Sequence, residues 1–139
     1  MSAREKLIEK IYQQGDPGSP DIPNPVVSLD DFFQGNDDVG SIGCNLDSHP
    51  GIDTFYQVLR SVRARESVQD VLVRINAVED MWPFSDVVYV ISSSPLEQIR
   101  EWLKPLQPDE VEDGLYWDQK LATDVELLPG MRIMYAWWD

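Results

Sequence analysis

The residues best suited to chemistry lie in an acidic, glycine-rich stretch in the first half of the chain. Five of them are candidate binding residues: Asn36, Asp37, Asp38, Asp47 and His49. Residues 29–53 hold six Asp and no Lys or Arg, and carboxylates gathered in this way could hold a hard cation through their oxygens. The residue spacing of a calcium-binding loop is absent. Because Asp and Asn also bond their own backbone in turns, we interpret these residues mainly as turn and capping residues and predict no metal ligands.

Catalysis by a thiol is a second reading of the same stretch, because Cys44 lies near His49. It would require contact between the two side chains and a third group to orient the imidazole. We expect Cys44 to point inward from a strand, where a buried thiol behaves as a small hydrophobe. The phosphate-binding, zinc-protease and nucleophile-elbow motifs are missing. We therefore predict no catalytic residues and no cofactor, and acid–base work by the loop carboxylates is the weakest alternative.

Three aromatic residues outside this stretch are further binding candidates: Trp82, Tyr116 and Trp117. Trp82 lies between two predicted strands, and the other two lie in an acidic segment near the C-terminus. Tryptophan and tyrosine are common at binding hot spots, so aromatic side chains flanked by acids predict an interface. The alternative is that each one seals a loop against the core.

The clearest structural pattern runs through residues 68–104. Residues 69–78 alternate apolar and polar side chains, which predicts a strand. Residues 86–92 are apolar without a break, which favours a strand buried on both faces. Residues 95–104 have helical spacing, with Ser94 as the expected N-cap and Glu97 completing a capping box.

The remaining elements are shorter. We predict a helix at 2–13, a proline-rich arm up to Pro25, and a helical turn LDDFF after Ser28. Further predictions are a strand at 41–46, a helix at 51–65 and a last strand at about 131–138. Before that last strand, residues 105–130 read as an acidic surface insertion, with a helical turn at 108–112.

This order of elements is β-α-β-β-α-β, so the predicted class is α+β with a ferredoxin-like antiparallel sheet and two helices on one face. Right-handed crossovers would place the first and third strands centrally and the second and fourth at the edges. Residues 1–25 form the N-terminal helix and arm, and residues 26–139 form a single α+β domain. An apolar set on the other sheet face needs a cover: Leu72, Val88, Val90, Met134, Ala136 and Trp138. Either the first 40 residues or a second subunit would supply it.

Composition limits the function classes. The chain has 139 residues, 42% of them hydrophobic, and a formal net charge of −14, which disfavours nucleic acid and anionic membranes as partners. No secretory signal or membrane-spanning run is visible, so we expect a cytoplasmic protein. The leading hypothesis is a non-enzymatic module of the bacterial immunity or accessory type that binds a basic protein. Its rival is a homodimer that binds a small ligand or metal ion at the open sheet face and the Asp-rich loop.

Overall fold

The computed structural model describes residues 1–20, 23–78 and 80–139, and it has an α+β fold. The α-helices in these residues are α1 (Ala3–Gln14), α2 (Leu29–Phe33), α3 (Ile52–Arg63) and α4 (Leu96–Leu103). The strands of its one sheet are β1 (Val26–Ser28), β2 (Val68–Arg74), β3 (Val87–Ser92), β4 (Glu110–Asp113) and β5 (Arg132–Trp137). Short 3₁₀ turns complete the order: η1 (Val39–Ser41), η2 (Lys104–Leu106) and η3 (Tyr116–Asp118).

The sheet is antiparallel throughout, with strand order β1-β2-β3-β5-β4. Strand β3 is central, and Tyr89 in its middle lies opposite Leu72 of β2 and Tyr135 of β5. All six residues of β3 are buried. The prediction that residues 86–92 form a strand buried on both faces is therefore confirmed, and its apolar sequence reflects neighbours on every side.

The predicted α+β class is confirmed, but the ferredoxin-like arrangement is not, because this strand order differs from the predicted one. Residues 41–46 do not form a strand of the sheet: Ser41 ends η1, a turn follows, and only Ile42 makes an isolated bridge, to Ser85. Gly43 has a φ of +65°, which L-residues rarely adopt, and a Cβ there would lie 2.9 Å from the Phe55 ring. The turn leaves Cys44 exposed rather than inward. Strand β1 occupies the sheet edge beside β2 instead.

The acidic insertion is also more ordered than the sequence suggests. The predicted helical turn at 108–112 is wrong, because β4 begins at Glu110 and pairs with β5. This added strand moves β5 from the predicted edge into the sheet. The strand was not predicted because three of the four residues of β4 are acidic. Acidic residues are depleted in strands except where a sheet edge faces water.

The N-caps of the first two helices are the ones that the sequence predicts, whereas the N-cap of α4 is not. Ser2 caps α1 by accepting a hydrogen bond from the Glu5 backbone N–H at 3.1 Å, as the capping box predicts. Ser28 caps α2 in the same way. The predicted cap of α4 is wrong, because Pro95 holds the N-cap position and the Ser94 hydroxyl bonds Ser67 instead.

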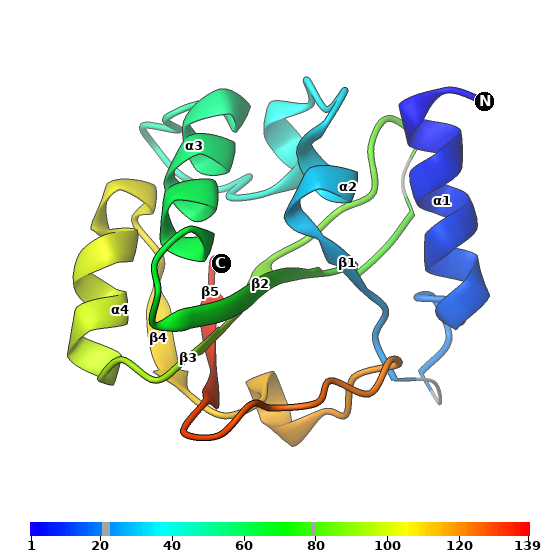
Figure 1. The fold of residues 1–139 in the computed structure, drawn as a ribbon. Helices are drawn as coiled ribbons and strands as arrows, with labels where there is room; N and C mark the ends of the chain where they lie inside the picture. Colours follow the sequence, from blue (N-terminus) through cyan, green and yellow to red (C-terminus); the bar gives the residue numbers. More distant parts are fainter. Residues whose placement is uncertain (21–22, 79) are drawn as a thin grey trace.

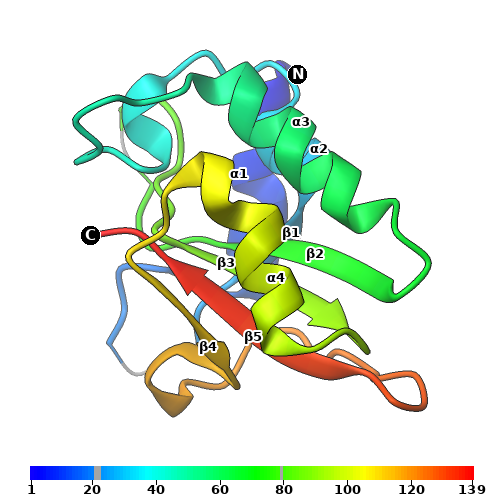
Figure 2. The same cartoon turned by 90° about the vertical axis from the view of Figure 1, so that its left-hand side faces the viewer.

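The helices share one face of the sheet. Figure 1 shows α2, α3 and α4 on one side, with α1 beside the β1 edge, and Figure 2 shows α3 and α4 side by side. The main core lies beneath them, where Leu7 and Phe32 of the N-terminal helices meet Val73, Val88 and other sheet residues. The apolar set predicted to be open mostly belongs to this covered face, and only its Leu72 points the other way.

The opposite face carries a smaller aromatic cluster. Tyr89 and Val87 are buried there, with Leu72, Tyr135 and Trp137 partly buried beside them. The segment that covers it is part of the insertion, residues 115–121, drawn in orange beneath the sheet in Figure 1. Helices α1 and α2, within the first 40 residues, lie on the main core together with all of the predicted apolar set except Leu72, and Val26 of β1 belongs to the second cluster.

Candidate functional site

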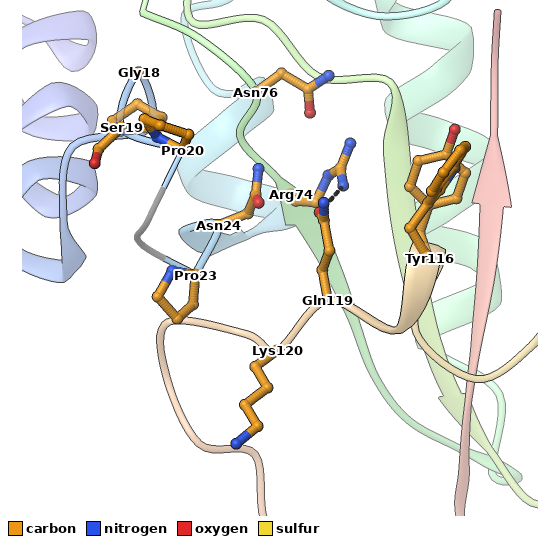
Figure 3. Close-up of a pocket in the computed structure, with 12 residues that line it drawn as sticks. Gly18, Ser19, Pro20, Pro23, Asn24, Arg74, Asn76, Tyr116, Gln119 and Lys120 are labelled. Carbon is orange, nitrogen blue, oxygen red and sulfur yellow. Dashed lines mark hydrogen bonds between the residues drawn. The ribbon is translucent and has the colours of Figure 1, made fainter.

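An open pocket of about 680 Å³ lies at one end of this second face. Three separate parts of the chain line it: the proline-rich arm, the end of β2, and the segment containing η3 (Figure 3). The arm and the insertion are joined by a bridge between Asn24 and Leu121, and the Ala122 N–H donates to the Asn24 carbonyl at 3.1 Å. The volume falls within the usual range for small-molecule sites.

Arg74 is the charged centre of the pocket wall, and it is only 5% exposed. Its Nη2 donates to Asp86 Oδ1 at 2.8 Å, and its Nη1 donates to Gln119 Oε1 at 3.1 Å. The Tyr116 ring centroid lies 5.0 Å from the guanidinium carbon, a cation–π contact. The buried Nε–H has no partner among the described residues. Leaving a buried donor unpaired costs about 1–3 kcal/mol.

Asn76 supplies a second unpartnered atom to the same pocket. Its backbone N–H donates to the Phe84 carbonyl, but its side-chain Oδ1 is buried without a partner. Asn24, across the pocket, uses its amide to donate to the Ile75 carbonyl at 3.4 Å. Figure 3 shows these side chains converging on one space. The pocket thus combines a donor and an acceptor that the protein itself leaves unused.

The segment over Arg74 has an unusual backbone. Trp117 and Asp118 have φ values of +54° and +53°, in the left-handed region that costs a non-glycine residue energy. Trp117 lines the pocket but is 77% exposed. Tyr116 stacks on Trp137 with centroids 6.0 Å apart, and its N–H donates to the Tyr89 hydroxyl at 3.3 Å. Tyr116 therefore anchors one side of the segment to the sheet, while the Trp117 side chain is largely exposed.

Tyr89 and Tyr135 on this face both have raised pKa values and remain protonated at neutral pH. Burial raises the pKa of Tyr89. Desolvation and a 2.8 Å hydrogen bond to Glu110 raise the pKa of Tyr135 to about 12. Both hydroxyls therefore act as neutral hydrogen-bonding groups that fix the aromatic cluster beneath the pocket.

The charge of the pocket is opposite to that of the chain. The described residues lining it include Arg74 and Lys120 but no Asp or Glu, whereas the whole chain has 25 acids against 11 Lys and Arg. Asp86 lies behind Arg74 as its ion-pair partner. Arg74, Lys120 and Asp86 together carry one excess positive charge, in a chain of net charge −14.

The predicted Asp-rich site lies elsewhere, and its side chains are used locally. The Asn36 amide donates to the Ser41 hydroxyl at 3.0 Å, and its Oδ1 accepts from the Asp38 N–H at 2.9 Å. Asp38 accepts from the Gly40 N–H at 2.9 Å, whereas Asp37 and Asp47 are exposed. This is the turn chemistry that we expected for these residues.

His49 fixes the entry to α3. Its Nδ1 accepts from the Gly51 N–H at 2.9 Å, so the hydrogen is assigned to Nε2, which lies 2.8 Å from the Ile42 carbonyl. With both ring nitrogens engaged by backbone groups, His49 is placed to hold the loop. Nowhere in the described part of the chain do three or more His, Cys, Asp or Glu come together in a way that could hold a metal ion.

The aromatic candidates divide into two groups. Trp82 is buried in the main core, where its indole N–H donates to the Phe32 carbonyl at 2.9 Å. Tyr116 and Trp117 line the pocket. The sequence analysis missed Arg74, Asn76 and Gln119 as site residues. The available signal was the pair of polar residues, Arg74 and Asn76, at alternate positions near the end of an apolar strand.

None of the helices among residues 1–20, 23–78 and 80–139 has the length and apolar character that crossing a bilayer requires.

Comparison with known proteins yields one family. The family model described as "Uncharacterized protein YfbO family" matches residues 2–136. The Escherichia coli (strain K12) protein named "Uncharacterized protein YfbO" is 35% identical over 141 residues, spanning 100% of this chain and 100% of that protein. No solved structure matches the chain. Because the family model and this relative both cover essentially the whole length, the chain belongs to the YfbO family.

Proposed function

We propose that this protein binds a small polar ligand in the pocket between the proline-rich arm, the end of β2 and the η3 segment. The observation that carries the proposal is that two residues lining one cavity, Arg74 and Asn76, each hold a buried, unpartnered polar atom, Nε and Oδ1. Such atoms are rare in native proteins, and a ligand is one of the few ways to satisfy them.

The composition of the pocket wall supports binding of a specific ligand rather than non-specific adsorption. It combines an arginine, two asparagines and a glutamine with the aromatic side chains of Tyr116 and Trp117. Ligand sites commonly have this form, in which aromatic surface provides contact area and a few polar groups fix orientation. The side chains come from segments far apart in sequence, so the site exists only in the folded chain.

A fragment screen by two-dimensional NMR tests the proposal. Uniformly ¹⁵N-labelled protein would be titrated with neutral, cationic and anionic polar compounds. We expect binders to shift the Arg74 Nε–H, the Asn76 side-chain amide and the Trp117 indole N–H together. Shifts that cluster elsewhere on the molecule, or no saturable shift from any compound, would contradict the proposal.

A matched pair of variants separates the pocket from the rest of the surface. Asn76→Ala removes the unpartnered acceptor and should weaken any binder found in the screen. Asn45→Ala changes the same residue type at an exposed position in the 36–53 stretch and should leave the affinity unchanged. Equal affinities for the two variants would remove Asn76 from the site.

A second function, the binding of a basic protein partner, is supported by different observations. Trp117 is 77% exposed beside acidic residues, and the net charge is −14. An acidic surface attracts a basic partner at a rate that added salt reduces. A pull-down with immobilised protein, followed by salt titration of each captured partner, tests this. Insensitivity to salt would count against charge-driven recognition. Homodimerisation also stays a prediction, which the solution mass would test.

A further inference from the structure

We propose that the ligand carries a carboxylate, and that this carboxylate replaces the Gln119 side chain on Arg74 when residues 116–120 move aside. The inference rests on the proposed function and adds the chemical class of the ligand and the route by which it reaches Arg74. Three features support it: the bonding state of Arg74, the charge balance of the pocket, and the backbone of the covering segment.

Gln119 presents a neutral amide oxygen to Arg74 at a position that an anion could take. Its Oε1 accepts from Arg74 Nη1 at 3.1 Å, while the adjacent Nε–H has no partner among the described residues. A guanidinium presents parallel N–H groups that match the two oxygens of a carboxylate, and such charge-assisted bonds are stronger than those to an amide. A carboxylate in the place of Gln119 would exchange a weaker partner of Arg74 Nη1 for a stronger one.

The charge balance favours a monoanion. Arg74 and Lys120 contribute two positive charges at the pocket, and Asp86, in contact with Arg74, contributes one negative charge. A single carboxylate brings this group to neutrality, whereas a dianionic phosphate ester would leave it negative. Near a chain of net charge −14, an excess negative charge adds to an already unfavourable potential.

Access requires movement, because the Nε and Oδ1 atoms are covered in this conformation. The covering segment would therefore have to move. Its Trp117 and Asp118 both hold left-handed backbone conformations that non-glycine residues disfavour. The Gln119 side chain is held to Arg74 by one hydrogen bond, from the guanidinium to a neutral amide oxygen. Opening would relieve the backbone strain and bring the exposed Trp117 ring against the body of the ligand.

Paired probes that differ only in charge test the inference. Benzoate with benzamide, and acetate with acetamide, would be titrated at constant ionic strength and followed through the Arg74 Nε–H and Trp117 indole signals. Phenyl phosphate serves as the dianion. We expect each carboxylate to bind at least about tenfold more tightly than its amide, and benzoate more tightly than phenyl phosphate.

The variant Gln119→Glu places a tethered carboxylate on Arg74 and should weaken benzoate binding by at least about tenfold. Gln98→Glu makes the same charge change on an exposed position of α4, on the other face of the sheet, and should leave benzoate binding within about twofold. A Gln119→Glu protein that binds benzoate like the wild type would overturn the displacement.

The remaining outcomes separate the inference from the function on which it rests. If amides shift the pocket signals as strongly as carboxylates, or phenyl phosphate outcompetes benzoate, the carboxylate assignment is wrong while small-ligand binding stands. If no compound in this panel or in the broader screen shifts the pocket signals, both proposals fall.

Discussion

Two polar regions of this molecule make opposite use of their side chains. In the Asp-rich loop, Asn36 and His49 bond neighbouring backbone or hydroxyl groups through both ends of their polar groups. In the pocket, Arg74 and Asn76 each leave a buried atom without a partner among the described residues. The loop looks richer in chemistry when read as sequence, yet its groups are occupied in holding the turn. In the pocket, two polar atoms keep bonding capacity that the described part of the chain does not use.

The difference shows that polar density alone is a poor guide to a binding site. Asp, Asn and His close together in sequence can reach one another's backbone, so they tend to form self-contained turns. A binding group must keep bonding capacity free, and that is easier where segments distant in sequence meet. In this chain the meeting point joins the arm, β2 and the insertion.

The largest loss of stability is expected when Arg74 is replaced. Arg74→Ala should destabilise the protein by about 3 kcal/mol, because Asp86 would lose its partner in a half-buried position. Urea unfolding followed by circular dichroism measures this. Lys10→Ala, which removes the more exposed pair with Asp31, should cost no more than about 1 kcal/mol. If the two variants lose the same stability, the Arg74 pair is not a buried anchor of the pocket.

Two asparagine variants test the contrast directly. Asn36→Ala should cost about 1–2 kcal/mol, because it breaks bonds to Ser41 and to the Asp38 backbone. Asn76→Ala should change stability by less than about 0.5 kcal/mol, because its buried oxygen has no bond to lose. Thermal unfolding of both variants with the wild type checks the order. A larger loss for Asn76 would mean that its oxygen is bonded in solution.

A smaller effect is expected at Asp30, on the helix-covered side. A hydrogen bond from the Tyr56 hydroxyl, followed by one from Arg63, lowers the pKa of the Asp30 carboxyl. The folded state therefore holds this proton less tightly than the unfolded state, and the stabilisation is present above the ordinary Asp pKa of about 4. It is lost as the pH falls through the lowered value.

Asp30→Asn should accordingly cost about 1 kcal/mol at pH 7, and its difference from the wild type should shrink as the pH falls below about 4. Urea unfolding from pH 7 to pH 2.5 follows this difference. A gap that stays constant across that range would show that Asp30 acts through packing or neutral hydrogen bonds rather than through its charge.

Much of the local structure was predictable. The periodic patterns of residues 51–65, 86–92 and 95–104 correspond to α3, β3 and α4, and Ser2 caps α1 as its sequence indicates. These elements follow from side chains within a few positions of each other. In the Asp-rich loop, in contrast, the alternation of Ile42 with Gly43 led us to predict a strand at 41–46 that does not form. Gly43 has a left-handed backbone conformation and lies close to the Phe55 ring, which favours a turn. Neither feature can be recognised in the local sequence pattern.

The site itself was predictable only in part. Tyr116 and Trp117 stood out as aromatic residues in an acidic segment, and both line the pocket. Arg74 in an apolar strand could equally face solvent, and whether its neighbours satisfy it depends on residues 12 and 45 positions away, Asp86 and Gln119. Periodicity gives the face of a strand but not what lies over that face.

By itself, the sequence determined the α+β class, the central buried strand, the main helices and the strongly acidic charge, because these depend on composition and on short-range spacing. The tertiary structure alone decided the strand order and the pairing of an acidic edge strand with β5. It also decided which sheet face the helices cover, and it brought Arg74, Asn76 and Gln119 around one pocket. The physical reason is that strand pairing and burial join residues far apart in the chain, so local patterns restrict these contacts without choosing among them.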